Sequence, residues 1–164
     1  MNFKKTISIL ILVAFVVSTI TTIPIQPAKA QATMKTYPIV DAIPNPIAVG
    51  QETLLKTGIS EALPSASYGW TDITITVVKP DGTSTTLGPL TTDSTGATYA
   101  TYVPDQVGNY TITTNFPNQT YPITYKPSGR TEPIQAGTIM LESSKSMTLE
   151  VLDELSQKFY PGHH

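Results

Sequence analysis

The sequence lacks cysteine and contains only two histidines. The absence of cysteine excludes disulfide bonds, which stabilise many small exported domains. Both histidines, His163 and His164, occupy the last two positions, so no histidine elsewhere can serve as the base for a serine or threonine nucleophile. Zinc-ligand spacing and a glycine-rich phosphate loop are also missing. We therefore expect a protein that is not an enzyme and uses no cofactor or metal.

Charged residues are scarce. They make up 13% of the chain, and the formal net charge is −2. After Lys5 the basic residues are scattered singly, which does not produce the basic patch that nucleic acids require. We expect no nucleic-acid partner. The alternating segments of the chain and the absence of a long apolar patch predict a monomer for the isolated domain.

Only one long apolar run occurs, and it lies near the N-terminus. Lys4 and Lys5 precede it, the run extends from Ile7 to Ile20, and Ala28 and Ala30 supply the small residues before a cleavage site. The run is shorter than the roughly 20 residues that span a bilayer. We predict that residues 1–30 are a signal peptide cleaved before Gln31, with an uncleaved anchor as the alternative. The mature protein is then secreted or held at the cell surface, without a membrane span.

The rest of the chain is rich in threonine, serine, proline and glycine, and its apolar residues alternate with a period of two. The clearest case is residues 70–78, where Ile73, Ile75 and Val77 face one side. A Pro-Asp-Gly turn after this segment indicates a hairpin. This pattern predicts an all-β fold, an antiparallel β-sandwich of about seven strands over residues 31–152. The expected strands are 36–43 at a proline-rich edge, 52–59, 70–78, 83–87, 97–103, 111–116 and, with a polar kink between its two parts, 139–141 and 147–152.

The hexapeptide at residues 105–110 indicates which kind of β-sandwich the chain forms. Asp105, Gly108 and Tyr110 precede a strand with the spacing of a tyrosine corner, in which a tyrosine hydroxyl bonds to upstream backbone. The sequence therefore predicts an immunoglobulin-like sandwich with Tyr110 as a structural residue.

Aromatic residues near two loops are the candidates for a binding surface. The segment 117–137 is too rich in proline to predict regular pairing, and loops of this length in compact domains are often functional. In such sandwiches this loop meets the loop that precedes residue 70. We therefore consider a binding surface made of Tyr68, Trp70, Tyr121 and Tyr125. The alternative is that Trp70 is a buried core residue and the tyrosines only fix a loop.

Three further features are less specific. Asn109 and Asn118 begin acceptor sequons for N-glycosylation, which matter only if the host glycosylates. Asp93 and Asp105 are the available donors for a calcium site at one end of the sandwich, although turn capping explains both. Residues 153–164 are expected to be a linker or, from Leu152 to Phe159, a short helix.

Several turns together resemble a known module. They are Val49-Gly50-Gln51, Val78 to Gly82, Leu87-Gly88-Pro89, Thr92 to Gly96, and Tyr102 to Tyr110. Over about residues 37–151 the chain resembles the N-terminal immunoglobulin-like module of secreted archaeal proteins that continue into a PQQ-binding-like β-propeller. The resemblance implies a non-catalytic binding or spacer module of a larger cell-surface protein, with a protein or glycan partner. The alternative is an accessory domain of a secreted propeller enzyme. The genomic sequence beyond His164 distinguishes the two.

Overall fold

Every regular element of the computed structural model, which describes residues 30–154, is a β-strand. Within this range there are eleven strands and no helix. Seven of them contain six or more residues: β2 (Pro38–Ile43), β4 (Thr53–Ile59), β5 (Ile73–Val78), β6 (Ser84–Leu90), β7 (Ala97–Tyr102), β8 (Gly108–Phe116) and β11 (Ser143–Leu152). The other four contain two residues each: β1 (Thr33–Met34), β3 (Ile47–Ala48), β9 (Gln119–Thr120) and β10 (Ile139–Met140).

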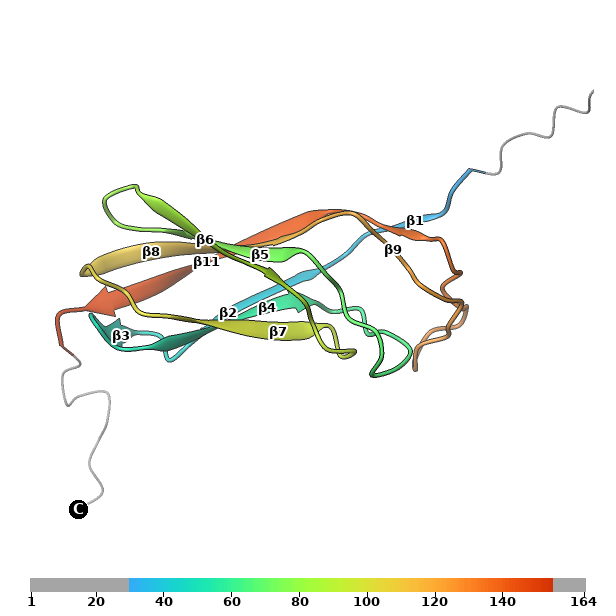
Figure 1. Ribbon diagram of the computed structural model, residues 1–164, viewed down its shortest axis with the longest axis horizontal. Helices are drawn as coiled ribbons and strands as arrows, with labels where there is room; N and C mark the ends of the chain where they lie inside the picture. Colours follow the sequence, from blue (N-terminus) through green and yellow to red (C-terminus); the bar gives the residue numbers. More distant parts are fainter. Residues whose placement is uncertain (1–29, 155–164) are drawn as a thin grey trace, which may run out of the picture. The chain divides into compact units, whose positions relative to one another are not determined.

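The long strands form two layers (Figure 1). One layer is a three-stranded sheet in the order β2-β4-β7, and the other is a five-stranded sheet in the order β3-β11-β8-β5-β6. The pairs of long strands are antiparallel, whereas the short strand β3 runs parallel to β11. The chain is therefore all-β, and its two sheets form a β-sandwich.

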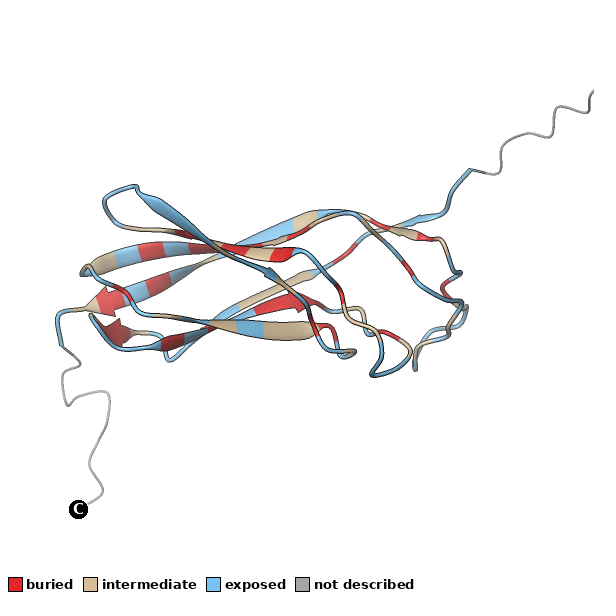
Figure 2. Cartoon of the chain, in the orientation of Figure 1, coloured by how far each residue is buried: buried red, intermediate tan, exposed pale blue. Residues whose placement is uncertain are grey.

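A first core cluster fills the space between the layers. Ala42 and Leu55 come from the three-stranded sheet, and Val77, Ile112 and Leu149 come from the five-stranded sheet. Strand β5 alternates buried and half-buried residues, as its sequence predicts, because successive side chains of a strand point to opposite faces. A similar alternation of buried and less buried residues is visible along β8 (Figure 2). Each large apolar side chain buried in this way stabilises the fold by about 1.5–3 kcal/mol.

A second core cluster lies at one end of the sandwich, beneath a small third sheet. This sheet has the order β1-β10-β9, with β1 parallel to β10. The cluster contains Trp70, Phe116, Tyr121, Ile134 and Met140. We call this end the β9 end. The opposite end, where the 79–82 turn joins β5 to β6 and where β8 begins, is the corner end (Figure 1).

Several sequence predictions need correction. The segment 117–137 is partly paired, because it contains β9 and a bridge between Tyr125 and Ile134. The polar kink predicted before Met147 is wrong: β11 begins at Ser143, and its polar residues pair with β8. Strand β1 was not predicted. The predicted signal peptide lies outside the described residues except for Ala30, and the predicted helix does so from residue 155 onward; Leu152 belongs to β11.

Candidate functional site

The aromatic binding surface considered in the sequence analysis is not present as an exposed surface. Trp70 is 2% exposed and Tyr121 is 0% exposed, so both are core residues and the interpretation of these two as binding residues is wrong. The Trp70 ring packs edge-on against Phe116, with 5.6 Å between ring centroids, and lies 6.0 Å from Tyr121. The indole N–H of Trp70 donates to the carbonyl of Glu61 at 2.8 Å. These contacts fit the alternative interpretation, in which Trp70 is a buried core tryptophan.

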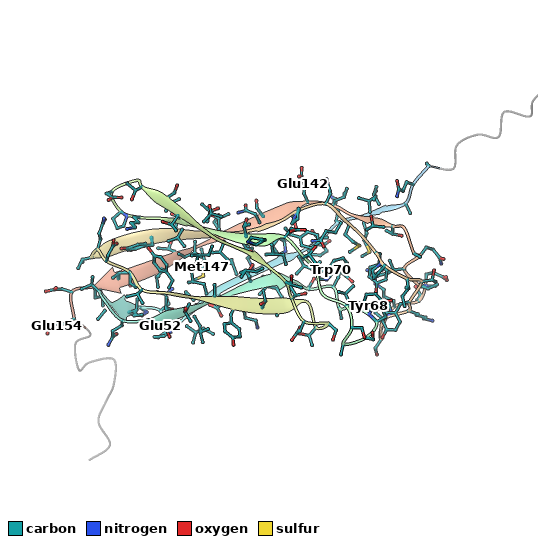
Figure 3. All side chains as sticks on the ribbon, in the orientation of Figure 1. Glu52, Tyr68, Trp70, Glu142, Met147 and Glu154 are labelled. Atoms are coloured by element: carbon teal, nitrogen blue, oxygen red, sulfur yellow. The ribbon has the colours of Figure 1, made fainter. Side chains whose placement is uncertain are left out.

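The other two aromatic residues of the considered surface lie beside the second core cluster. Tyr68 and Tyr125 are partly buried and pack against the second core cluster. Tyr68 and Trp70 both lie at the β9 end (Figure 3). The reason for this burial is that the 117–137 segment folds back over the sandwich and pairs with itself, which covers the aromatic rings.

The predicted corner has its hydrogen bonds at the opposite end of the sandwich. The Tyr110 hydroxyl accepts from the Gln106 N–H at 2.9 Å. The same oxygen lies 3.1 Å from the Gln106 carbonyl and 3.3 Å from the Asp105 carboxylate, to either of which its single hydrogen can be donated. Burial raises the pKa of the Tyr110 hydroxyl. Gly108 packs close to Pro80, where a Cβ would lie 2.9 Å from the proline ring. The ring of Tyr110 is buried, so these hydrogen bonds connect the core to the corner.

Two side-chain contacts join this corner to the 79–82 turn. Lys79 Nζ forms an ion pair with Asp105 at 2.6 Å, and the Gln106 amide donates to Asp81 at 2.7 Å. The hydrogen bond from Lys79 lowers the pKa of Asp105. Hydrogen bonds from Thr83 and then Gln106 lower the pKa of Asp81 to about 2. The corner end is thus a network of local turn contacts.

The remaining predicted residues do not form a site. Asn109 and Asn118 are both exposed, and Asn118 Oδ1 accepts from the Glu142 N–H at 2.7 Å. Asp93 and Asp105 precede and follow β7, so they lie at opposite ends of that strand and cannot share a calcium ion. Within residues 30–154 no three His, Cys, Asp or Glu side chains converge to hold a metal. Ala28 lies outside the described residues, and Ala30 and Gln31 are exposed.

The strongest candidate site is a polar groove that the sequence analysis did not identify. It lies at the β9 end, where β5, β8 and β11 of the five-stranded sheet meet the flanking loops, and its volume is about 510 Å³. We call it the polar groove, and its lining residues are Asp72, Thr74, Asn115, Phe116, Pro117, Glu142, Ser143 and Ser144. Thr74, Asn115 and Ser144 are neighbours in one row across three strands. The only feature of the sequence that indicates this groove is the concentration of Ser, Thr and Asn on the polar side of these strands.

Asp72 has an unusual backbone conformation. Its φ is 57°, the only positive φ of a non-glycine residue between positions 30 and 154. Aspartate tolerates this left-handed region better than most residues, but it still costs about 1–2 kcal/mol relative to an ordinary conformation. The preceding residue is fixed, because the Thr71 N–H and carbonyl both bond to the Gln119 amide, at 3.0 and 2.8 Å. The β9 strand therefore holds Asp72 in place at the groove.

The other polar groups of the groove are also fixed. The Asn115 amide nitrogen lies 3.2 Å from the Thr76 hydroxyl and 3.5 Å from the Thr74 hydroxyl, which leaves the amide oxygen to accept from a ligand. The Ser143 hydroxyl bonds to Thr36. Glu142 is exposed, and its main chain is held by Asn118. Figure 3 labels Glu142 on the outer side of the sandwich.

The chemistry of the polar groove follows from these groups. Two carboxylates and an amide oxygen are acceptors, and the hydroxyls both donate and accept. The lining contains no lysine, arginine or histidine. The groove can therefore bind a ligand that presents several hydroxyl groups, whereas an anion would meet two negative charges.

A second groove lies on the outer face of the three-stranded sheet and has a volume of about 550 Å³. Ile43, Leu54 and Tyr99 contribute exposed apolar surface to it, and Lys56 and Asp93 contribute charges.

Comparison with known protein families, characterised proteins and solved structures finds no match to this chain. Between residues 30 and 154 the chain forms no helix that is long and apolar enough to cross a membrane.

Proposed function

We propose that this chain is an exported, non-catalytic immunoglobulin-like module that binds a glycan in the polar groove. The observation that carries the proposal is the convergence of two carboxylates, an amide and several hydroxyls around a surface groove of about 510 Å³. A neutral sugar presents hydroxyl groups that donate to carboxylates and accept from serine and threonine. The groove therefore matches the hydrogen-bonding chemistry of a sugar.

The immunoglobulin-like assignment is supported by strand order. The sheets β2-β4-β7 and β6-β5-β8-β11 correspond to strands A-B-E and C′-C-F-G of that fold. A buried tryptophan, Trp70, precedes the strand that corresponds to C, and Tyr110 lies near the start of the strand that corresponds to F. The position of Tyr110 is typical of immunoglobulin-like sandwiches, and the buried tryptophan of antibody domains lies on strand C itself.

A glycan fits the polar groove better than a protein surface does. The centres of protein interfaces are enriched in aromatic residues and depleted of Asp and Glu. The only aromatic residue of the groove, Phe116, is 2% exposed, and the half-buried Pro117 supplies the accessible apolar contact. Because the groove exposes no aromatic ring, we expect weak binding that depends on hydrogen bonds.

The substitution Asp72→Gly tests this proposal without damaging the fold. Glycine relieves the backbone strain at φ 57° but makes the unfolded chain more flexible, so the free energy of unfolding should change by no more than about 1 kcal/mol. Loss of the carboxylate should nevertheless weaken binding at least about tenfold, the range of a charge-assisted hydrogen bond. Isothermal titration of the purified protein with neutral oligosaccharides of glucose, mannose, galactose and N-acetylglucosamine measures this.

The matched control is Asp41→Asn, because Asp41 is an exposed carboxylate on β2, in the other sheet. Its affinity should equal that of the unmodified protein. Absence of binding to every oligosaccharide, or equal binding by the Asp72→Gly variant, would contradict the proposal.

Export is the second part of the proposal and has its own test. The Gln31 side chain donates to the carbonyl of Gly137 at 3.0 Å, so the described fold makes contacts from this residue onward. We expect mass spectrometry of the exported protein to give an N-terminus at Gln31. An intact Met1 in a membrane fraction would favour an uncleaved anchor instead.

A further inference from the structure

We propose that the glycan is a linear, uncharged polysaccharide that continues from the polar groove along the outer face of the five-stranded sheet. This inference rests on the proposed function and specifies its ligand. It starts from the register of the strands. The groove row, Thr74, Asn115 and Ser144, is followed toward the corner end by two more rows of outward-facing residues.

The two further rows consist almost entirely of hydroxyl-bearing side chains. The second row is Thr86, Thr76, Thr113 and Ser146, and the third is Ser84, Val78, Thr111 and Thr148. We call these two rows the hydroxyl track. Seven of its eight residues are Ser or Thr, and none is charged.

The dimensions of the track suit a chain rather than a single sugar. Residues two apart on a strand are separated by about 6.6–6.8 Å, so the third row lies about 13 Å from the groove row. Donors and acceptors therefore repeat in a line that starts at the groove. A ligand that fills the groove and is long enough can use this line.

The absence of charge on the track decides the class of polymer. Solvent-facing surfaces ordinarily carry Lys and Glu, and the outer face of the three-stranded sheet does so in part, with Asp41 and Lys56 paired across β2 and β4. The track offers no cation to an acidic polysaccharide, and the two carboxylates of the groove would repel one. A neutral chain matches both features.

The test compares oligosaccharides of one to six units binding to the purified protein. For the glycan series that binds, the six-unit chain should bind at least about tenfold more tightly than the single sugar, because it can form two or more additional hydrogen bonds. Acidic chains of the same length, such as oligogalacturonates, should bind less tightly than the neutral series.

Variants distinguish the contribution of the hydroxyl track to binding from that of the polar groove. Thr111→Val with Thr148→Val removes two exposed hydroxyls from the third row and keeps the β-branched shape. This double variant should weaken binding of the six-unit chain about fivefold and leave two-unit binding unchanged. The control is Thr101→Val, at an exposed position of β7 in the other sheet. It should change the affinity for neither the six-unit nor the two-unit chain.

The outcomes distinguish this inference from the proposed function. If affinity is the same for all chain lengths but falls in Asp72→Gly, the groove binds a single sugar and the track inference is wrong. Equal binding of acidic chains would also overturn it. If the unmodified protein binds no oligosaccharide of any series, both the proposed function and this inference fail.

Discussion

The hydroxyl groups of Thr57 and Thr114 hydrogen-bond to each other across the interior of the sandwich. Thr57 belongs to β4 and Thr114 to β8, so this bond connects the two sheets. Both side chains are completely buried. Because a buried hydroxyl without a partner is costly, the hydrogen bond between the two threonines offsets the cost of burying both hydroxyls.

We predict that substitutions of this pair are non-additive: the double substitution should cost less free energy of unfolding than the sum of the two single substitutions. Thr57→Val or Thr114→Val leaves the remaining hydroxyl without a partner and should lower the free energy of unfolding by about 1–3 kcal/mol. Replacing both with valine removes both polar groups at nearly constant shape, and the cost should fall well below the sum of the two. Urea unfolding of the four proteins measures the coupling. Additive costs would show that the hydroxyls do not interact.

Most of the sheet residues in this core could be predicted from the sequence, because a strand with one buried face alternates with a period of two. The ranges 52–59, 97–103 and 111–116 agree with β4, β7 and β8 to within a few residues. Alternation also places Thr114 between Ile112 and Phe116 on the inner face. It does not reveal which residue of the opposite sheet meets Thr114, because that depends on how the two sheets pack.

The second core and the polar groove could not be predicted in the same way. Tyr121 comes from a proline-rich segment without a regular period, and the packing of Trp70 and Met140 against it depends on how the 117–137 segment returns over the sandwich. The groove depends on the same return, because β9 holds Thr71 and Asn118 holds Glu142. Loop paths are set by these long-range contacts, which local sequence patterns do not encode.

Tyr110→Phe should destabilise the protein by about 1–3 kcal/mol, because the Gln106 N–H would lose its acceptor at a part-buried position. The control is Tyr99→Phe, because Tyr99 is 66% exposed and its loss of a hydroxyl should cost less than about 0.5 kcal/mol. Urea melts of both variants give the comparison. If Tyr110→Phe melts like the unmodified protein, the hydroxyl does not stabilise the corner.

We predict that Tyr121→Phe also destabilises the protein, like Tyr110→Phe and unlike the exposed control Tyr99→Phe. As a loop residue Tyr121 would be insensitive to loss of its hydroxyl, but its ring is fully buried and its hydroxyl donates to the Ala62 carbonyl at 3.3 Å. We expect a loss of about 0.5–1.5 kcal/mol, the net value of one hydrogen bond. An unchanged urea midpoint would mean that this long bond contributes nothing.

Gly58→Ala should be the most damaging small substitution in β4. Gly58 has a φ of +141°, and a Cβ there would lie 2.0 Å from the carbonyl oxygen of Gly96, so backbone must move. We expect a loss of more than about 3 kcal/mol in the free energy of unfolding. Gly82→Ala is the control, because its φ is +85° but a Cβ there would meet nothing within 4 Å. It should cost only about 1–2 kcal/mol. Similar losses for both would exclude the close approach as the cause.

The stability of the protein should fall in acid, and Asp81 should contribute to the fall. Its pKa is lowered from 3.8 to about 2 in the folded protein, first by the hydrogen bond from the Thr83 hydroxyl. The unfolded chain therefore takes up the proton first as the pH falls. The stabilisation by this carboxylate is complete above about pH 4 and is lost as the pH falls toward 2.

Asp81→Asn tests this assignment. The variant should be less stable than the unmodified protein at pH 6, and the difference should shrink between pH 4 and pH 2, because the Asp81 carboxylate of the unfolded chain takes up its proton before that of the folded protein. Asp93→Asn should behave in the same direction, because hydrogen bonds from Thr95 lower the pKa of Asp93. Urea unfolding at intervals from pH 2 to pH 7 measures both differences. A difference that is independent of pH, or that grows in acid, would mean that the hydrogen bonds to Asp81 do not favour its charged form.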